Sequence, residues 1–228
     1  MDERQLIEQQ VAYYRARAHE YDEWYFRKGR YDRGAKHRAR WFREIGIVEE
    51  ALREAIRGRV VLELACGTGL WTRHLAETNP RVVAVDASPE AIAINQERVA
   101  SPNVQYIVSD IFSWAPPERF DAVFFAFWLS HVPPGQLEAF WAQVRTMLKG
   151  AGRVFFADSL LEQSSTAKNH RPLDTSGVVK RKLNDGREFE IVKVFYEPSD
   201  LQARLQNLGW KGSVHSTGTF FLYGSVTP

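Results

Sequence analysis

A turn containing two glycines, with an acidic residue in front of it, is the part of this 228-residue sequence that most directly predicts chemistry. The turn reads Glu63-Leu64-Ala65-Cys66-Gly67-Thr68-Gly69; it continues the apolar run 60–64 and precedes a helical pattern over 70–78. Glycines between a buried strand and a helix let the backbone approach a ligand at the carboxyl edge of a parallel sheet. A lone G-x-G turn can also be a simple tight turn, so the surrounding residues have to decide between the two.

Two residues of this segment separate the kinds of ligand that it suits. A dinucleotide-binding turn has the pattern G-x-G-x-x-G, but the third glycine position is occupied by Thr72. Glu63 stands close to the expected ligand, where an acid is unfavourable beside a diphosphate and favourable beside a cation. The sulfonium and ammonium groups of S-adenosylmethionine (SAM) are cations that fit this position. We therefore expect SAM rather than the nicotinamide dinucleotide of an oxidoreductase.

Two further acids follow the next predicted strands. Asp86 ends the apolar run 81–86, and Asp110 comes directly after the run 104–108. Either acid alone could cap a helix or a turn. Three acids at the ends of successive strands, Glu63 included, are better explained by one cofactor site at the carboxyl edge of the sheet.

With these acids, the E-x-x-C-G-T-G turn resembles that of the class I SAM-dependent methyltransferases, and the resemblance covers about residues 60–223. It implies that Asp86 accepts hydrogen bonds from the two ribose hydroxyls and that Asp110 accepts one from the adenine amino group. It also implies SAM as cofactor and S-adenosylhomocysteine (SAH) as product. We expect no metal, and the single cysteine excludes a multi-cysteine zinc site. The cofactor contacts that we expect are Tyr14, Glu63, Ala65, Gly67, Gly69, Asp86, Ala87, Asp110, Ile111 and Phe127.

The loop after the fourth predicted strand, residues 127–134, borders the point of methyl transfer in this family. His131 is the candidate general base, since an unperturbed histidine is partly neutral at working pH and can take a proton. The alternative is that His131 packs structurally at the start of a helix. A carboxylate acceptor would need no base, because transfer depends mainly on the alignment of nucleophile, methyl and sulfur.

Aromatic residues are dense in the N-terminal segment 13–26. We expect Tyr14, Tyr21 and Trp24 to form a lid that excludes water from the sulfonium, although each could instead pack into the core. A hairpin over 178–195, signalled by Asn184-Asp185-Gly186, would form a second wall with Phe189 and Phe195. The expected substrate contacts are Tyr21, Trp24 and Trp128.

Short apolar strands alternating with helices predict an α/β fold with a doubly wound, mostly parallel, Rossmann-like sheet of seven strands. We expect five βα units, the inserted hairpin, one more helix over 200–208 and a closing antiparallel pair of strands, so that the last strand is antiparallel. Residues 1–58 would form the N-terminal helical lid and acceptor-pocket segment. Residues 59–228 would form the SAM-binding core, with the insertion at about 176–197.

Composition is that of an ordinary globular protein, with 44% apolar residues, 30 basic against 28 acidic residues and a single cysteine. The most apolar run, 122–129, is far shorter than the ~18 residues of a membrane span. A charged N-terminus without an apolar stretch behind it gives no secretion signal. We expect a soluble, cytoplasmic protein with no membrane partner.

The sequence thus predicts an enzyme that methylates an O, N or S atom of a small molecule. An RNA methyltransferase using the basic run 27–43 is one alternative; we do not expect a nucleic-acid partner, because no RNA-binding domain is recognisable. A cofactor-binding scaffold without turnover is another. The acceptor and the oligomeric state stay open.

Overall fold

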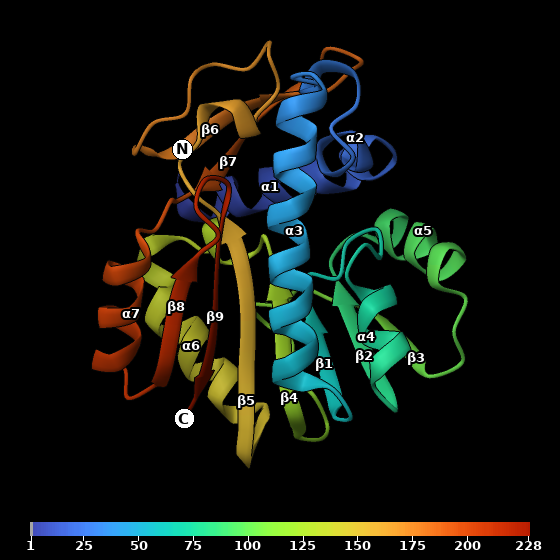
Figure 1. The fold of residues 1–228 in the computed structure, drawn as a ribbon, viewed down its shortest axis with the longest axis vertical. Helices are drawn as coiled ribbons and strands as arrows, with labels where there is room; N and C mark the ends of the chain where they lie inside the picture. The colour runs from blue at the N-terminus through green and yellow to red at the C-terminus, as the bar shows by residue number, and fades with distance from the viewer. Residues whose placement is uncertain (1) are drawn as a thin grey trace.

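A seven-stranded sheet forms the centre of the computed structural model, which describes residues 2–228 (Figure 1). The strand order is β3-β2-β1-β4-β5-β9-β8, with β1 to β5 parallel and β9 antiparallel to both of its neighbours. This confirms the predicted doubly wound, mostly parallel sheet with an antiparallel last strand. The strands are β1 (Val60–Leu64), β2 (Arg81–Asp86), β3 (Val104–Val108), β4 (Phe120–Ala126), β5 (Leu148–Ser159), β8 (Lys211–Ser216) and β9 (Phe221–Thr227).

Helices cover both faces of the sheet because the strand side chains are apolar on both sides. On β4, Val123 and Phe125 pack towards α6 and α7, whereas Ala122 and Phe124 pack towards α3 and α4. Helix α5 packs beside α4, over β2. The helices are α3 (Ala35–Ile56), α4 (Thr72–Thr78), α5 (Pro89–Val99), α6 (Leu137–Thr146) and α7 (Pro198–Asn207), and the 3-10 turns are η1 (Ala18–Glu20), η2 (Gly29–Tyr31), η3 (Leu129–His131), η4 (Pro134–Gln136) and η5 (Gln163–Ser165).

The expectation of five βα units is wrong, because helices directly follow β1, β2 and β4 but not β3. Residues 109–119 connect β3 to β4 through turns. Pro116 and Pro117 lie in this connection; a proline lacks the amide that a helix interior needs and disfavours helical backbone in the residue before it.

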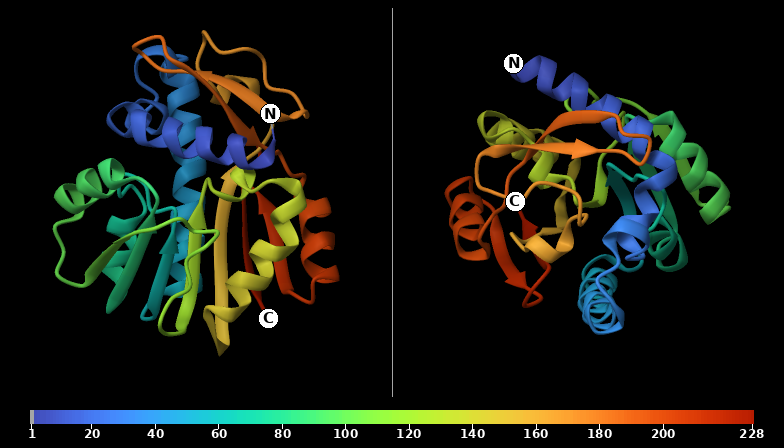
Figure 2. Two further views of the ribbon diagram at one scale, coloured as in Figure 1. Left: turned by 180° about the vertical axis from the view of Figure 1, so that it is seen from behind. Right: turned by 90° about the horizontal axis from the view of Figure 1, so that it is seen from above.

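The remaining elements lie together over the carboxyl edge of the sheet. Helices α1 (Glu3–Arg17) and α2 (Tyr21–Tyr25) cross this edge beside the hairpin of β6 (Gly177–Lys182) and β7 (Glu188–Lys193), as two views show (Figures 1 and 2). The predicted hairpin is confirmed as a separate two-stranded antiparallel sheet. Helix α3, in contrast, runs down one face of the main sheet.

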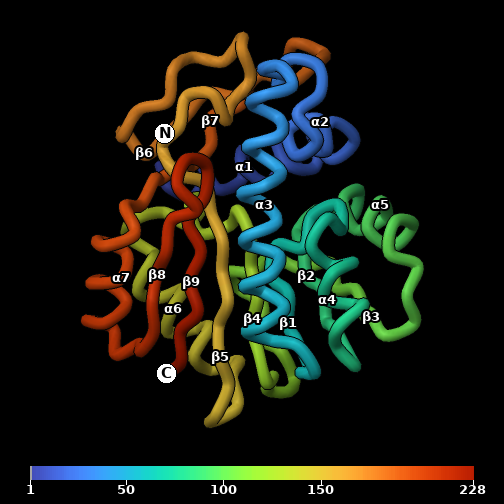
Figure 3. The backbone as a smooth tube through the Cα atoms, in the orientation of Figure 1, coloured from blue at the N-terminus to red at the C-terminus, as the bar shows by residue number. Residues whose placement is uncertain are grey.

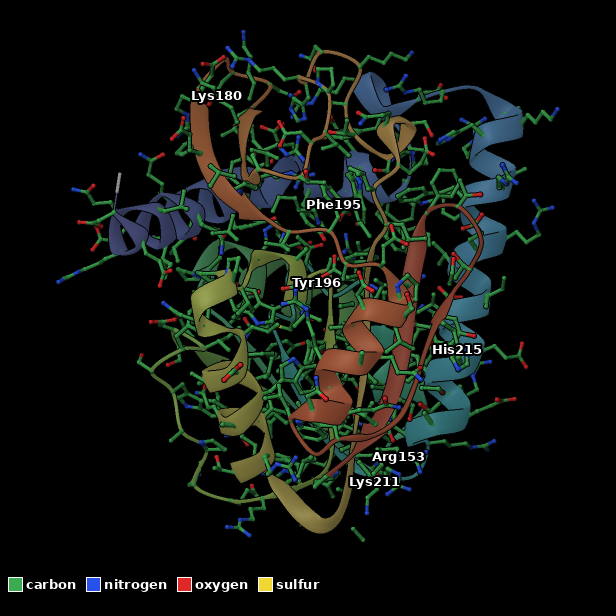
Figure 4. All side chains as sticks on the ribbon, turned by 90° about the vertical axis from the view of Figure 1, so that its left-hand side faces the viewer. Arg153, Lys180, Phe195, Tyr196, Lys211 and His215 are labelled. Carbon is green, nitrogen blue, oxygen red and sulfur yellow. The ribbon has the colours of Figure 1, made fainter. Side chains whose placement is uncertain are left out.

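The hairpin is reached from β5 by a long loop and returns towards α7, a path that the tube drawing makes plain (Figure 3). Phe195 and Tyr196 lie where the returning chain meets the body of the sheet, whereas Lys180 stands on the outer part of the hairpin (Figure 4). None of the helices in residues 2–228 combines the length and the apolar character that crossing a membrane requires.

Candidate functional site

Strained backbone marks the carboxyl ends of two neighbouring strands. Ala65 directly follows β1 and Phe127 directly follows β4, with φ of 53° and 56° respectively. Residues other than glycine seldom adopt this left-handed conformation, and such residues cluster at functional sites. Because β1 and β4 are adjacent in the sheet, the two strained residues lie side by side at its edge.

The glycine turn after β1 is held by α5. The Nδ2 of Asn95 donates to the carbonyl of Gly67 (3.2 Å) and to Oγ1 of Thr72 (2.9 Å). Gly69 has φ of 88°, and a Cβ there would lie 2.5 Å from Oδ1 of Asn95. Glycine is therefore required at position 69 for packing against α5, while the residue itself lines none of the cavities described below.

A cavity of about 820 Å³, here called the cofactor cavity, opens at this edge. Its walls come from the ends of β1, β2, β3 and β4 and from α1. Eight of the ten expected cofactor contacts line it, namely Tyr14, Ala65, Gly67, Asp86, Ala87, Asp110, Ile111 and Phe127.

Asp86 organises the turn that lines the cofactor cavity. Its Oδ2 accepts from the amide of Gly67 and its Oδ1 from the amide of Ser88, both at 2.8 Å. Burial raises the pKa of Asp86, while these amide donors oppose the rise. A carboxylate has about four acceptor positions, so Asp86 keeps lone pairs for further donors. Asp110, by contrast, is exposed and accepts from the amide of Phe112 at 3.1 Å.

Glu63 lies in a smaller adjoining cavity of about 340 Å³, whose walls include Tyr21 and Tyr25. Its side chain is 1% exposed, and Oε2 has no hydrogen-bond partner among the described residues. Burial raises the pKa of Glu63 to about 8, against a hydrogen bond from Thr72 that lowers it. A buried carboxyl oxygen without a donor is costly, and an ammonium group placed here would satisfy it.

A third cavity of about 550 Å³, the acceptor cavity, lies between α1 and the hairpin. Four residues line both this cavity and the cofactor cavity: Tyr14, Tyr21, Phe127 and His131. The two cavities therefore meet at these side chains. The expected lid residue Trp24 and the expected hairpin residue Phe195 also line the acceptor cavity.

Cationic side chains line the acceptor cavity with few counter-charges. Arg17 and Lys193 are each 8% exposed, and Arg181 is half-buried. Asp158 lies 3.5 Å from Lys193, but neither Arg17 nor Arg181 has a carboxylate within 4 Å in residues 2–228. Burial lowers the pKa of Lys193 and of Arg181, with Asp158 opposing the shift at Lys193.

Both ring nitrogens of His131 are hydrogen-bonded to groups of the protein. Its Nδ1 lies 2.6 Å from the carbonyl oxygen of Val192, which can only accept, so Nδ1 carries the proton. Nε2 then accepts from the hydroxyl of Tyr14, also at 2.6 Å. Burial, reinforced by nearby Lys193, lowers the pKa of His131 well below its usual value. The imidazole is therefore neutral, and both of its nitrogens are engaged within the protein.

Three other residues that the sequence singled out, Trp128, Phe189 and Arg27, do not line the acceptor cavity. Trp128 lines the cofactor cavity, with its ring centroid 5.3 Å from that of Phe112, and not the acceptor cavity. Phe189 packs against Tyr13 at 5.7 Å. Within the basic run 27–43, Arg27 is fully buried and donates to the carbonyls of Ser164 and Ser165 in η5.

Sequence reasoning missed the polar lining of the acceptor cavity. These residues come from α1, η2, the end of β5, the loop after it and the hairpin, so no local pattern joins them. The missed residues are Tyr13, Arg17, Tyr31, Ser159, Thr166, His170, Arg181 and Lys193. In the described part of the chain, no group of three or more His, Cys, Asp or Glu side chains is placed to hold a metal ion.

Comparisons with known proteins agree with this geometry. A family model described as "Methyltransferase domain" matches residues 61–152. A solved structure named "DhpI-SAH complex structure" is 42% identical with a TM-score of 0.79, covering 98% of this chain and 97% of that one. A second, named "DhpI-SAM-HEP complex", is 41% identical with a TM-score of 0.81 and full coverage of both chains.

Curated relatives match over shorter stretches. Ubiquinone biosynthesis O-methyltransferase from Pseudomonas fluorescens is 28% identical over 161 residues, covering 69% of this chain and 66% of its own length. Malonyl-[acyl-carrier protein] O-methyltransferase 1 from Ilyobacter polytropus is 30% identical over 67 residues. This second match covers 28% of this chain. The chain therefore spans about a quarter of the length of the Ilyobacter enzyme and just under two thirds of the length of the Pseudomonas enzyme.

Proposed function

The chain belongs to the class I SAM-dependent methyltransferases, and from that premise we propose that it transfers the methyl group of SAM to an oxygen of a small anionic acceptor. SAM is the cofactor and SAH the product. The observation that carries the acceptor assignment is the pair of guanidinium groups in the acceptor cavity, that of buried Arg17 and that of half-buried Arg181, which have no carboxylate partner among residues 2–228. The curated O-methyltransferases among its relatives fit transfer to oxygen.

The residues of the cofactor cavity suit SAM group by group. Asp86 ends β2 with free lone pairs that can accept from two ribose hydroxyls. Asp110 and Ile111 lie further along the same edge and would hold the adenine. The orphaned Oε2 of Glu63 would face the ammonium of the methionine part. Tyr14 and Phe127 lie where the cofactor cavity meets the acceptor cavity, which is where the sulfonium has to lie.

The acceptor cavity favours an anion because two of its cations, Arg17 and Arg181, have no carboxylate within 4 Å among residues 2–228. The only hydrogen bond of the Arg17 side chain in residues 2–228 is to the hydroxyl of Tyr31 at 3.3 Å, and its Nε has no partner. Arg181 donates to Oγ1 of Thr166 at 3.3 Å. A buried charge without a counter-ion costs several kcal/mol, and an anionic ligand would remove that cost. Guanidinium groups suit carboxylate and phosphoryl oxygens in particular.

The solved structure named "DhpI-SAM-HEP complex" supports an acceptor site next to the cofactor. Its name gives a component, HEP, in addition to the protein and SAM. With 41% identity over the full length of both chains, a corresponding molecule is expected in the acceptor cavity of this protein.

Methyl transfer to an oxyanion balances without a base. A lone pair of the acceptor oxygen forms the new O–CH3 bond as the S–CH3 bond breaks, and the sulfur keeps the electron pair. Positive sulfonium and negative oxygen are both neutralised in this step, so no proton has to move. The protein contributes alignment and the exclusion of water. His131, with both ring nitrogens already hydrogen-bonded, is not needed as a general base for such an acceptor.

Helix α1 acts as the lid in this proposal. Gln10 donates from Nε2 to the carbonyl of His131 (3.0 Å) and accepts from the amide of Val192 (3.1 Å), which ties α1 to η3 and to β7. An ion pair between Asp22 and Arg98 ties α2 to α5. Residues 1–58 would thus combine a lid, α1 and α2, with a helix of the sheet face, α3. The single free cysteine, Cys66, fits a cytoplasmic setting.

A screen with matched acceptors tests the proposal. The protein is incubated with SAM and pairs of small molecules of equal size, a carboxylate or phosphonate against its neutral amide or alcohol, and products are read by mass spectrometry. We expect methyl esters from anions alone. Methylation of neutral alcohols or amines, with every anion left unchanged, would refute the anionic acceptor while leaving the family assignment intact.

A further inference from the structure

We propose that the phenolic oxygen of Tyr14 contacts the SAM sulfonium with its lone pairs, accepting weak C–H···O contacts from the methyl group, and that His131 is the positioning residue that keeps these lone pairs free. The inference rests on the proposed function for the place of the sulfonium. Its first test below needs no acceptor, so it can fail independently of the acceptor assignment.

The first step is the direction of the Tyr14 hydroxyl. Nδ1 of His131 is committed as a donor to the carbonyl of Val192, so Nε2 can only accept. Tyr14 lies 2.6 Å from this nitrogen and therefore points its single proton at it. Burial raises the pKa of Tyr14 well above its usual value, which keeps that proton on the oxygen. The phenolic oxygen of Tyr14 can then meet a ligand only with its lone pairs, that is, as an acceptor.

The second step is where those lone pairs lie. Tyr14 is one of four residues shared by the cofactor and acceptor cavities. A methyl group passing from one cavity to the other has to cross this junction, so the sulfonium lies beside it. Oxygen lone pairs attract a cation and repel an oxyanion. The Tyr14 oxygen is therefore suited to the sulfonium and its methyl group, whereas Arg17 and Arg181 are suited to the anion.

The third step is the role of His131. A free tyrosine hydroxyl beside an oxyanion would turn its proton towards that oxyanion, stabilising the nucleophile and engaging the lone pair that has to attack. With its proton held by His131, Tyr14 cannot do so. The groups around the imidazole favour its neutral form: Arg17 on α1, Arg181 on β6 and Lys193 on β7 all oppose a further positive charge. His131 thus acts through Tyr14.

Cofactor binding is the first test. SAM carries a sulfonium and SAH a neutral sulfide, so calorimetric titrations of both ligands isolate the contact. We expect Tyr14→Phe to weaken SAM binding about three- to tenfold more than SAH binding. The matched control is Tyr196→Phe, which removes a buried hydroxyl that has no hydrogen-bond partner among the described residues and lines none of the cavities. Equal weakening of SAM and SAH by Tyr14→Phe overturns the proposal.

A double-mutant cycle on kcat is the second test, with an accepted anion as substrate. If His131 acts through Tyr14, His131→Leu lowers kcat in the wild-type background and changes it less than about twofold in the Tyr14→Phe background. A large further loss in the Tyr14→Phe background means that His131 acts on its own, as a general base would, and overturns its positioning role. Should His131→Leu fail to fold, the binding test on Tyr14→Phe still decides the sulfonium contact.

Discussion

The guanidinium of Arg17 lies 3.3 Å from the hydroxyl of Tyr31, and no carboxylate comes within 4 Å of it in residues 2–228. Burial lowers the pKa of Arg17, and the surrounding tyrosines Tyr13 and Tyr31 raise it, with a net rise. The charge is therefore retained inside the protein. A bound anion would supply the counter-ion that the buried guanidinium of Arg17 lacks among residues 2–228.

Removal of either unpaired guanidinium is expected to weaken acceptor binding selectively. For Arg17→Gln or Arg181→Gln, we expect the acceptor KM to rise roughly ten- to hundredfold, since a hydrogen bond to a charged group contributes about 1.5–3 kcal/mol. SAM affinity should change little. Steady-state kinetics with an accepted anion and calorimetry with SAM measure the two effects.

The matched control is Arg187→Gln, because Arg187 is exposed at the hairpin tip and pairs with Asp185 there. Its acceptor KM should equal that of the wild type. A wild-type KM in both Arg17→Gln and Arg181→Gln would contradict the anionic acceptor site.

Replacement of Asp86 tests the ribose contact. Asp86→Ala should weaken SAM binding by ~1.5–3 kcal/mol, the usual contribution of hydrogen bonds to a charged acceptor. Asp121→Ala is the control, because Asp121 also accepts from a backbone amide, that of Val60 at 2.9 Å, but lies at the opposite edge of the sheet. Calorimetry should show unchanged SAM affinity for the control. Equal SAM affinity in both variants would remove the ribose assignment.

Proton release should accompany SAM binding near neutral pH. In the free protein burial raises the pKa of Glu63 from 4.5 to about 8, so the carboxyl is largely protonated at about pH 7. The SAM ammonium favours the carboxylate, and binding therefore releases most of one proton. Calorimetry in buffers of different ionisation enthalpy measures this release. It should vanish in Glu63→Gln, and wild-type binding heats that do not depend on the buffer would speak against the ammonium contact.

The same pKa shift predicts how stability of the free protein depends on pH. Between 4.5 and about 8 the unfolded chain loses the Glu63 proton that the folded chain keeps, so the free energy of unfolding falls as pH rises through this window. Glu63→Gln should lack this part of the fall. Urea unfolding of the ligand-free proteins at several pH values measures it, and parallel curves for the two proteins would contradict the shift.

Docking of α1 should depend on Gln10, which bridges η3 and β7. Gln10→Leu leaves a buried carbonyl and a buried amide without partners, a cost of about 1–3 kcal/mol for each group. We expect faster hydrogen exchange in α1 and higher KM for both SAM and the acceptor. Gln96→Leu on the exposed side of α5 is the control, and unchanged α1 exchange in Gln10→Leu would argue against the lid.

The parts of the site that sequence predicts are those with a local signal. Glu63, Asp86 and Asp110 each end or follow an apolar run, and parallel strands bring such ends to one edge. The cations of the acceptor cavity have no such signal, because Arg17, Arg181 and Lys193 come together only when α1 docks on the hairpin. Most of the fold was predictable from apolar strand runs that alternate with helical patterns and from the Asn184-Asp185-Gly186 turn of the hairpin, but the connection 109–119 was not.

Charge density in the sequence does not identify the cations that line the acceptor cavity. The basic run 27–43 attracts attention in the sequence, yet its Arg27 is buried as a donor to the carbonyls of Ser164 and Ser165. The direction of the Tyr14 hydroxyl is equally invisible in sequence, because it depends on a carbonyl of β7, that of Val192. Side-chain roles of this kind follow from tertiary contacts between distant segments.

Helix α1 is a common wall of the two cavities, since Tyr14 faces both. A displacement of α1 that frees spent SAH would at the same time take Arg17 away from the acceptor, because both side chains stand on this one helix. Methylated product could not stay bound through an exchange of cofactor by that route. Each catalytic cycle would then begin when α1 docks again and closes the cofactor cavity and the acceptor cavity at the same time.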